Sequence, residues 1–196
     1  MTILCTYKTK NRIYLACDTQ VTKDVKSNCK TKWHPLEISE DTIIPVGCTG
    51  YAQFGDFIEH GFKPPRWDKN EEDFEDYLHN ELSPALTKEI ISRNISKVRD
   101  GELDTESEFI FVYDDVYSLV KNCSPLRIRD KFYAAGTGSE IAYGAYYSYS
   151  RNILFEEYTA DVEELLDNCV SAAQEYNLYC GGDVVISIFC IPGATE

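Results

Sequence analysis

Long apolar runs are missing from this sequence. No stretch approaches the ~20 residues that a membrane-spanning helix needs, and Lys8, Lys10 and Arg12 interrupt the region where a secretory signal would have its apolar core. Basic residues are scarce as well: 19 Lys and Arg face 33 Asp and Glu, so the formal net charge is -14. Because phosphate binding needs clustered cations, this balance argues against a nucleic-acid partner. We expect a soluble, cytoplasmic protein with neither nucleic-acid nor membrane partners.

Spacings that would hold a metal are also missing. The eight cysteines include no C-x-x-C pair, and several stand in apolar stretches such as YLACD and ISIFC. His34, His60 and His79 form no spaced ligand set. We therefore predict reduced, mostly buried thiols and no metal site. The cysteines are Cys5, Cys17, Cys29, Cys48, Cys123, Cys169, Cys180 and Cys190.

Linkers, short-period repeats and low-complexity tracts are absent, so the sequence predicts one domain over residues 1–196. Alternating, β-branched stretches predict strands, and apolar residues at helical spacing predict helices. Pro84 should kink or divide the helix expected over residues 71–98. The expected strands are 2–9, 13–21, 31–38, 42–50, 108–115, 116–122, 125–138 and 184–191. The expected helices are 51–61, 71–98, 139–150 and 160–178, with a loop at 99–107.

The order of these elements shows no βαβ alternation. Strands come first, then two helices, more strands, two helices and one final strand. Hairpins dominate, beginning with the pair 2–9 and 13–21 around a tight turn. Such an order favours the α+β class, in which antiparallel sheets carry helices on their outer faces.

Position 2 offers a candidate nucleophile. If Met1 is removed, Thr2 carries a hydroxyl and a free α-amine on one atom framework. An α-amine has a pKa of about 7.7–8, so it can serve as a general base at neutral pH and activate a weak hydroxyl nucleophile. A small residue at position 2 commonly indicates only that the initiator methionine is trimmed, and this alternative stays open.

Residues at the end of the second strand and on the strand that follows strengthen the case for Thr2. Asp18 and Thr19 end the second strand of the opening hairpin, and antiparallel pairing brings that end back toward Thr2. Lys32 lies on the following strand. A buried Asp–Lys pair beside a hydroxyl would keep the lysine charged and lower the pKa of the hydroxyl. The alternative is a surface lysine and an aspartate that caps a turn.

Three glycine-containing turns complete the pattern. GCTG, residues 47–50, ends a strand and opens a helix, where backbone N–H groups can form an oxyanion hole, although an ordinary turn is the commoner outcome. FYAAGTGSEIAYGA, residues 132–145, has the same form, and its GTGS lacks the spacing and lysine of a phosphate-binding loop. YCGGD, residues 179–183, is a helix-to-strand turn in which glycines give the backbone freedom.

In their order and spacing, these features resemble the proteasome-like N-terminal-nucleophile hydrolases. That family includes proteasome β subunits and the bacterial HslV peptidase, and the short stand-alone members of phages and bacteria are the most similar. The resemblance runs from Thr2 to about Phe189 and is loosest over 62–107. It implies a four-layer αββα sandwich of two antiparallel sheets covered by helices.

The resemblance also implies roles for individual residues. Thr2 would be nucleophile and base, Asp18 and Lys32 its activating pair, and the backbone N–H of Gly47 or Cys48 the oxyanion donor. Lys32 lies slightly earlier than the family spacing predicts, which makes Lys30 its rival. The residues expected to shape the substrate pocket are Gln20, Val21, Cys48 and Thr49.

Supporting positions depart from the family pattern. Thr137 stands where a serine near the N-terminal amine is usual, and Ser139 falls at a second supporting hydroxyl position. Asn177 stands where an aspartate is usual, so a carboxylate is lost from the proton network around the amine. Cys180 falls where serine or cysteine is seen.

The implied activity is that of a threonine-type peptidase or amide hydrolase that forms an acyl-enzyme on Thr2 and needs no cofactor. Peptides or proteins would be its substrates, a homo-oligomeric ring its assembly, and an unfoldase ATPase a candidate partner. Two alternatives stay open. One is a non-catalytic homologue that serves as an assembly module or interferes with a host protease, and the other is a small-molecule amidohydrolase.

Overall fold

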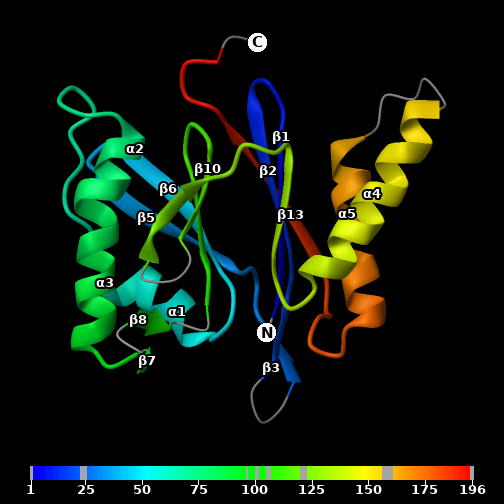
Figure 1. Ribbon diagram of the computed structural model, residues 1–196, viewed down its shortest axis with the longest axis horizontal. Coiled ribbons are helices and arrows are strands. Elements are labelled where there is room, and N and C mark those ends of the chain that lie inside the picture. Colours follow the sequence, from blue (N-terminus) through cyan, green and yellow to red (C-terminus); the bar gives the residue numbers. More distant parts are fainter. Residues whose placement is uncertain are drawn as a thin grey trace. The chain divides into compact units, whose positions relative to one another are not determined.

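The computed structural model describes residues 2–22, 26–95, 97–99, 102–104, 107–119, 123–155 and 161–194. The chain divides into two compact units: unit 1 comprises Met1–Lys32 and Arg129–Glu196, and unit 2 comprises Trp33–Ile128. The larger sheet of each unit is antiparallel and has helices against it (Figure 1). The single domain over 1–196 stays a prediction. No helix in the described ranges is long and apolar enough to cross a membrane.

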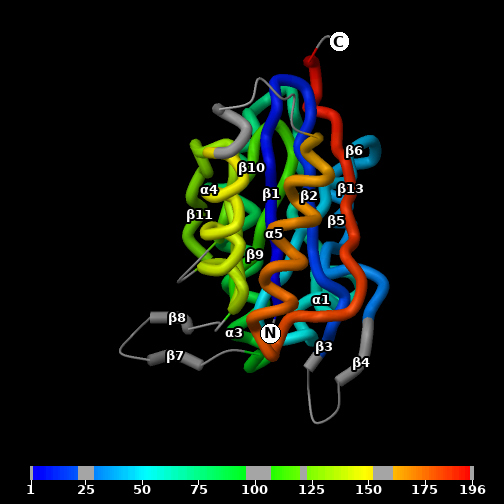
Figure 2. The backbone as a smooth tube through the Cα atoms, turned by 90° about the vertical axis from the view of Figure 1, so that its right-hand side faces the viewer, coloured from blue at the N-terminus to red at the C-terminus, as the bar shows by residue number. Residues whose placement is uncertain are grey.

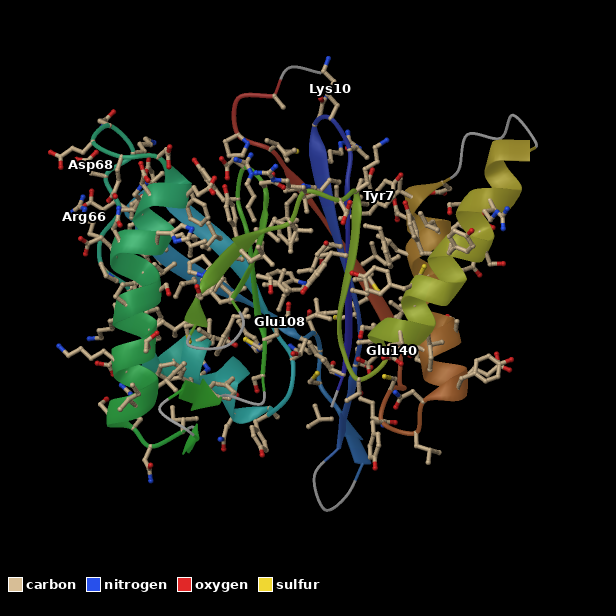
Figure 3. The ribbon with its side chains drawn as sticks, viewed as in Figure 1. Tyr7, Lys10, Arg66, Asp68, Glu108 and Glu140 are labelled. Carbon is tan, nitrogen blue, oxygen red and sulfur yellow. The ribbon has the colours of Figure 1, made fainter. Side chains whose placement is uncertain are left out.

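Unit 1 is built on a four-stranded antiparallel sheet in the order β12-β1-β2-β13. Its strands are β1 (Ile3–Lys8), β2 (Arg12–Asp18), β12 (Phe132–Gly136) and β13 (Val184–Cys190). Helices α4 (Ser139–Phe155) and α5 (Val162–Tyr176) pack side by side against this sheet (Figure 2). Tyr7 on β1, labelled in Figure 3, lies on the side of the sheet that faces the helices. Its ring packs against that of Tyr146 of α4, with centroids 6.4 Å apart. A short hairpin, β3 (Gln20–Thr22) with β4 (Lys26–Asn28), follows the sheet.

The strand register brings four chain segments together at one end of this sheet. Leu4 pairs with Cys17 across the opening hairpin, so the start of β1 lies beside the end of β2. Ile3 also pairs with Gly136, at the end of β12. Val184, the first residue of β13, is opposite Asp18. The predicted hairpin is therefore present, and its register brings the residue after Met1 next to the end of β2.

Unit 2 has a five-stranded antiparallel sheet in the order β11-β10-β9-β6-β5. Its strands are β5 (Trp33–Ser39), β6 (Thr42–Cys48), β9 (Phe109–Val112), β10 (Val116–Leu119) and β11 (Pro125–Arg127). Its helical segments are α1 (Gln53–Asp56), the π-helical η1 (Phe57–Gly61), α2 (Phe74–Tyr77), the π-helical η2 (Leu78–Leu82) and α3 (Ser83–Ser92). Buried aromatic side chains fill the space between the helices and the sheet.

The helix expected over 71–98 is shorter at both ends. It begins at Phe74, where the Asp73 side chain accepts a hydrogen bond from the Asp76 N–H and caps it, and it ends at Ser92. Asn94 then takes a positive φ of 54°, a conformation that stops a helix. Pro84 lies in the first turn of α3, directly after the π turn η2. The backbone stays helical at Leu82 and Ser83, so the helix changes from π to α there without the predicted division, and a kink stays a prediction.

Two other expectations are corrected. The predicted loop 99–107 contains strand residues, because β7 (Lys97–Arg99) and β8 (Glu102–Asp104) pair as a short hairpin. The predicted strand 125–138 is two strands of different sheets, β11 and β12. The charged turn at Asp130 and Lys131 separates them, since its exposed side chains do not suit a sheet interior.

Candidate active site

The Asp18 carboxylate is the centre of the candidate site. Asp18 ends β2 and is fully buried. Its Oδ1 accepts hydrogen bonds from Thr2 Oγ1 at 2.9 Å, the Ile3 N–H at 3.0 Å and Lys32 Nζ at 2.6 Å. Its Oδ2 accepts the Gly181 N–H at 3.0 Å. All four partners are donors, which is the environment that an ionised carboxylate requires.

Lys32, and not the alternative candidate Lys30, lies beside Asp18. Its side chain is 8% exposed and forms an ion pair with Asp18, whereas Lys30 is exposed. Breaking a buried pair of this kind is costly, because the remaining charge has lost both water and its counter-ion. Thr2, itself only 3% exposed, donates to the same carboxylate oxygen. The structure thus brings Thr2, Asp18 and Lys32 together, and their catalytic roles stay a prediction.

A tight turn surrounds the carbonyl oxygen of Thr2. Thr137 Oγ1 and the Gly138 N–H both donate to Thr2 O at 3.5 Å. Gly136 takes a φ of +92°, and a Cβ on it would lie 2.2 Å from Thr2 O. Only glycine permits this approach. All three residues of the sequence GTG therefore lie against the main chain of Thr2: Gly136 by close approach, and Thr137 and Gly138 by hydrogen bonds.

Asn177 holds this turn from the other side. Its Nδ2 donates to Thr137 O at 2.7 Å, and its Oδ1 accepts the Tyr179 N–H at 2.9 Å. Ser139 is the first residue of α4 and makes no hydrogen bond to Thr2 within the described residues. Of the two predicted supporting hydroxyls, Thr137 therefore contacts Thr2 directly and Ser139 does not.

Gly47 and Cys48 belong to unit 2. They end β6, where Gly47 pairs with Trp33 and Ile110, and the chain turns before α1 begins. The predicted strand-to-helix turn is therefore present. Burial raises the pKa of the Cys48 thiol far above its usual range, so the thiol stays neutral. The backbone N–H groups of this turn as oxyanion donors stay a prediction.

Two backbone donors to Asp18 escaped the sequence analysis. The Ile3 and Gly181 N–H groups complete the shell around the carboxylate. Gly181 lies close to Gln20: a Cβ on Gly181 would lie 2.5 Å from Gln20 Oε1 and displace the end of that side chain, and the Gln20 N–H donates to Gly181 O at 2.8 Å. The YCGGD turn was the available signal, since its glycines indicate a close backbone approach.

Neutral thiols lie around the carboxylate. Cys29 Sγ donates to Thr19 O at 3.3 Å, and Cys17 Sγ lies 3.7 Å from Thr31 Oγ1. Burial raises the pKa of the Cys180 thiol to about 11, so it is protonated at neutral pH. All eight cysteines are free. No group of three or more His, Cys, Asp or Glu side chains within the described residues could hold a metal ion.

Comparison with known proteins finds similarity only in structure. No family model matches the sequence, and no curated protein matches it. BPH from Thiobacillus denitrificans is similar at a TM-score of 0.69 and 20% identity, over 98% of this chain and 100% of that chain. BPH in complex with epoxomicin gives 0.68 and 19%, over 96% and 98% of the two chains. HslV from Trypanosoma brucei gives 0.57 and 14%, over 95% and 98%.

At these identities the likeness establishes the fold. The similar structures span essentially the full length of this chain and of their own chains. Two antiparallel sheets, each with its helices, agree with the predicted α+β class and αββα sandwich. The chain has the proteasome-like N-terminal-nucleophile hydrolase fold shared by BPH and HslV.

Proposed function

We propose that the protein is a threonine-type peptidase or amide hydrolase that acts through an acyl-enzyme on Thr2 after removal of Met1. The observation that carries the proposal is the carboxylate oxygen that Thr2 and Lys32 share: Asp18 Oδ1 accepts from Thr2 Oγ1 at 2.9 Å and from Lys32 Nζ at 2.6 Å, in a buried site. A scaffold has no need for a buried ion pair against a hydroxyl, because desolvating two charges is unfavourable.

In the first step the α-amine of Thr2 accepts the hydroxyl proton while Oγ1 attacks the carbonyl carbon of the substrate. Asp18 orients the hydroxyl, and the Lys32 ammonium on the same carboxylate oxygen favours negative charge at Oγ1. The ammonium of Thr2 then gives its proton to the leaving nitrogen. The C–N bond breaks, and an ester of Thr2 remains.

In the second step water attacks the ester carbon, and the α-amine takes a proton from that water. The C–O bond to Thr2 breaks, Oγ1 regains its proton, and a carboxylic acid leaves. The Gly47 or Cys48 N–H would hold the oxyanion in both steps. These residues supply base, nucleophile and electrostatic stabilisation, and the reaction requires no cofactor.

The same proposal covers the setting of the reaction. Peptides or proteins are the proposed substrates, in a homo-oligomeric ring in the cytoplasm, with an unfoldase ATPase as a candidate partner. BPH, which has the same fold, has been solved in complex with epoxomicin, and this supports a site that accepts such a compound here.

Turnover of fluorogenic peptides by Thr2→Ala and Thr2→Ser variants tests the proposal. Thr2→Ala should lower kcat by more than about a thousandfold, because the nucleophile is gone. Thr2→Ser keeps a hydroxyl and an amine and should retain measurable turnover. Thermal unfolding would show that both variants fold. Unchanged turnover by Thr2→Ala would contradict the mechanism and favour the non-catalytic alternative.

A further inference from the structure

Asn177 makes a pair of side-chain hydrogen bonds whose directions are fixed by their partners. Nδ2 faces the carbonyl oxygen of Thr137 at 2.7 Å, and Oδ1 faces the N–H of Tyr179 at 2.9 Å. A backbone carbonyl only accepts and a backbone N–H only donates. The side chain therefore has to supply one donor and one acceptor, and an amide does so in only one orientation.

The bond to Thr137 reaches Thr2 through a single turn. Thr137 Oγ1 and the Gly138 N–H are the two groups that donate to Thr2 O, and both flank the carbonyl that Asn177 holds. The turn is also tightly packed on its inner side, where a Cβ on Gly138 would lie 2.9 Å from the Ala173 Cβ and from Cys180 Sγ. A small shift of this turn would therefore move the main chain of Thr2.

Asn177 is itself held at the end of a helix. Its N–H donates to Ala173 O at 3.0 Å, which closes the last turn of α5. Its carbonyl accepts the Cys180 N–H at 3.0 Å. The backbone of Asn177 is thus fixed by α5 and by the turn that carries Gly181, the donor to Asp18 Oδ2.

We propose that Asn177 is a positioning residue whose neutral amide fixes the turn 136–138 against the carbonyl of Thr2. The catalytic part of this inference rests on the proposed function, whereas the placement of the turn does not. An ionised aspartate at position 177 could accept from Tyr179 but would set an acceptor against Thr137 O. In this chain an aspartate at that position would therefore weaken the site.

The substitution Asn177→Asp creates a pH-dependent test of this idea. A protonated carboxyl has one O–H donor and can replace the amide donor to Thr137 O, whereas the ionised form cannot. No described hydrogen bond or ion pair joins the Asn177 side chain to a titratable side chain of the surrounding elements. The titratable side chains on the surrounding elements are Glu140 on α4, Glu175 and Tyr176 on α5, Tyr179 and Cys180 in the turn, Asp18 on β2, Asp183 before β13, and Lys32.

Peptide turnover should be compared for wild type, Asn177→Asp, Asn177→Ala and the control Asn168→Asp between pH 5.5 and 8. Asn168 is exposed on α5, so its variant adds the same charge away from the turn. At pH 8 both Asn177 variants should lose at least about tenfold in kcat, with KM nearly unchanged. The Asn177→Asp to wild-type ratio should rise as the pH falls, while the other two ratios stay flat. Asn177→Asp turnover equal to or above wild type at pH 8 would overturn the proposal.

Hydrogen exchange gives a readout that does not depend on turnover. At pH 8, backbone amides of residues 133–143 should exchange faster in Asn177→Asp than in wild type, and Asn168→Asp should match wild type. Faster exchange without any peptide turnover in wild type would refute the proposed function and leave the positioning of the turn intact. Turnover in wild type with unchanged exchange and a flat pH ratio would refute the role of Asn177 alone.

Discussion

The interiors of the two units are built from different side chains. Nine aromatic residues are buried in the core of unit 2, whereas Phe132 is the one buried aromatic in the core cluster of unit 1 among the described residues. Unit 1 uses alanine and cysteine instead, and the buried ion pair Asp18–Lys32 belongs to it. Large rings bury the most apolar surface per residue, and small side chains let backbones approach closely.

This difference separates stability from chemistry. In unit 2, Trp67 packs against Tyr113 and Phe74 with ring centroids 5.1 and 5.6 Å apart. In unit 1, close approach of the backbone lets the Gly138 and Gly181 N–H groups reach Thr2 O and the Asp18 carboxylate. We infer that unit 2 gains stability from its rings, while unit 1 places polar groups within hydrogen-bond distance of Thr2.

The largest expected effect on stability comes from breaking the ion pair of unit 1. Asp18→Ala removes the carboxylate that pairs with the buried Lys32 ammonium and should lower the free energy of unfolding by about 3–5 kcal/mol, with loss of turnover. Lys32→Met should cost less, because Asp18 keeps three other donors. Urea unfolding of both variants measures the difference. A larger loss for Lys32→Met would contradict the donor arrangement around Asp18.

A ring deletion in unit 2 should affect stability without affecting chemistry. Phe74 is 2% exposed and packs against Trp67, Tyr113 and Tyr117. Phe74→Ala should lower the free energy of unfolding by about 3 kcal/mol through the cavity it leaves. Turnover per folded molecule should stay within about twofold. Leu126→Ala, at an exposed position of the same unit, should change stability by less than about 0.5 kcal/mol. A large kcat loss in Phe74→Ala would blur the division between the units.

The smallest expected effect at neutral pH concerns the thiols, whose contribution to stability changes only in alkaline solution. Burial raises the pKa of Cys180 to about 11 and of Cys169 to about 12 in the folded protein, above the value of about 8.5 for an exposed thiol. The unfolded chain therefore loses these protons first, so stability should fall as the pH rises from about 8.5 toward 11. Thermal unfolding across this range measures the fall. Serine at both positions should reduce this fall without abolishing it, because other buried thiols such as Cys48 contribute as well. An unchanged slope would contradict the burial of these two thiols.

The exposed cysteine provides a check on the same thiols. Cys190 is exposed, and Cys180 and Cys169 are buried. A thiol-specific alkylating reagent at pH 8 should modify Cys190 in the native protein and reach the two buried thiols only after unfolding. Rapid native labelling of Cys169 would show that the core of unit 1 opens readily.

The fold could be predicted from the sequence where alternation, turn residues and residue spacing all indicated the same element. Alternation on both sides of a tight turn predicted the opening hairpin, and its register explains why Thr2 and Asp18 meet. The predicted end of the helix at residue 98 was wrong, because the apolar spacing continued past Ser92 and was given more weight than Asn94, whose positive φ ends the helix. The predicted strand 125–138 was wrong because its pattern does not show that β11 and β12 join different sheets.

The candidate site was only partly visible for a similar reason. The residue type shows that Asp18 and Lys32 carry charged side chains. It does not show that the backbone N–H groups of Ile3 and Gly181 donate to Asp18, because every residue except proline has such a group. Lys30 and Lys32 are two positions apart in the sequence. Only the structure shows that Lys32 is buried and Lys30 is exposed. Likewise, the letter at Asn177 shows the loss of a carboxylate but not its hydrogen bond to Thr137 O.

The intact mass of the protein purified from cells, before and after incubation with epoxomicin, tests the central proposal most directly. The account predicts loss of Met1, a further mass increase after incubation with epoxomicin, and no such increase in the Thr2→Ala variant. A retained methionine with no mass increase would leave Thr2 without a free amine. That result would contradict the proposed mechanism and favour the non-catalytic alternative.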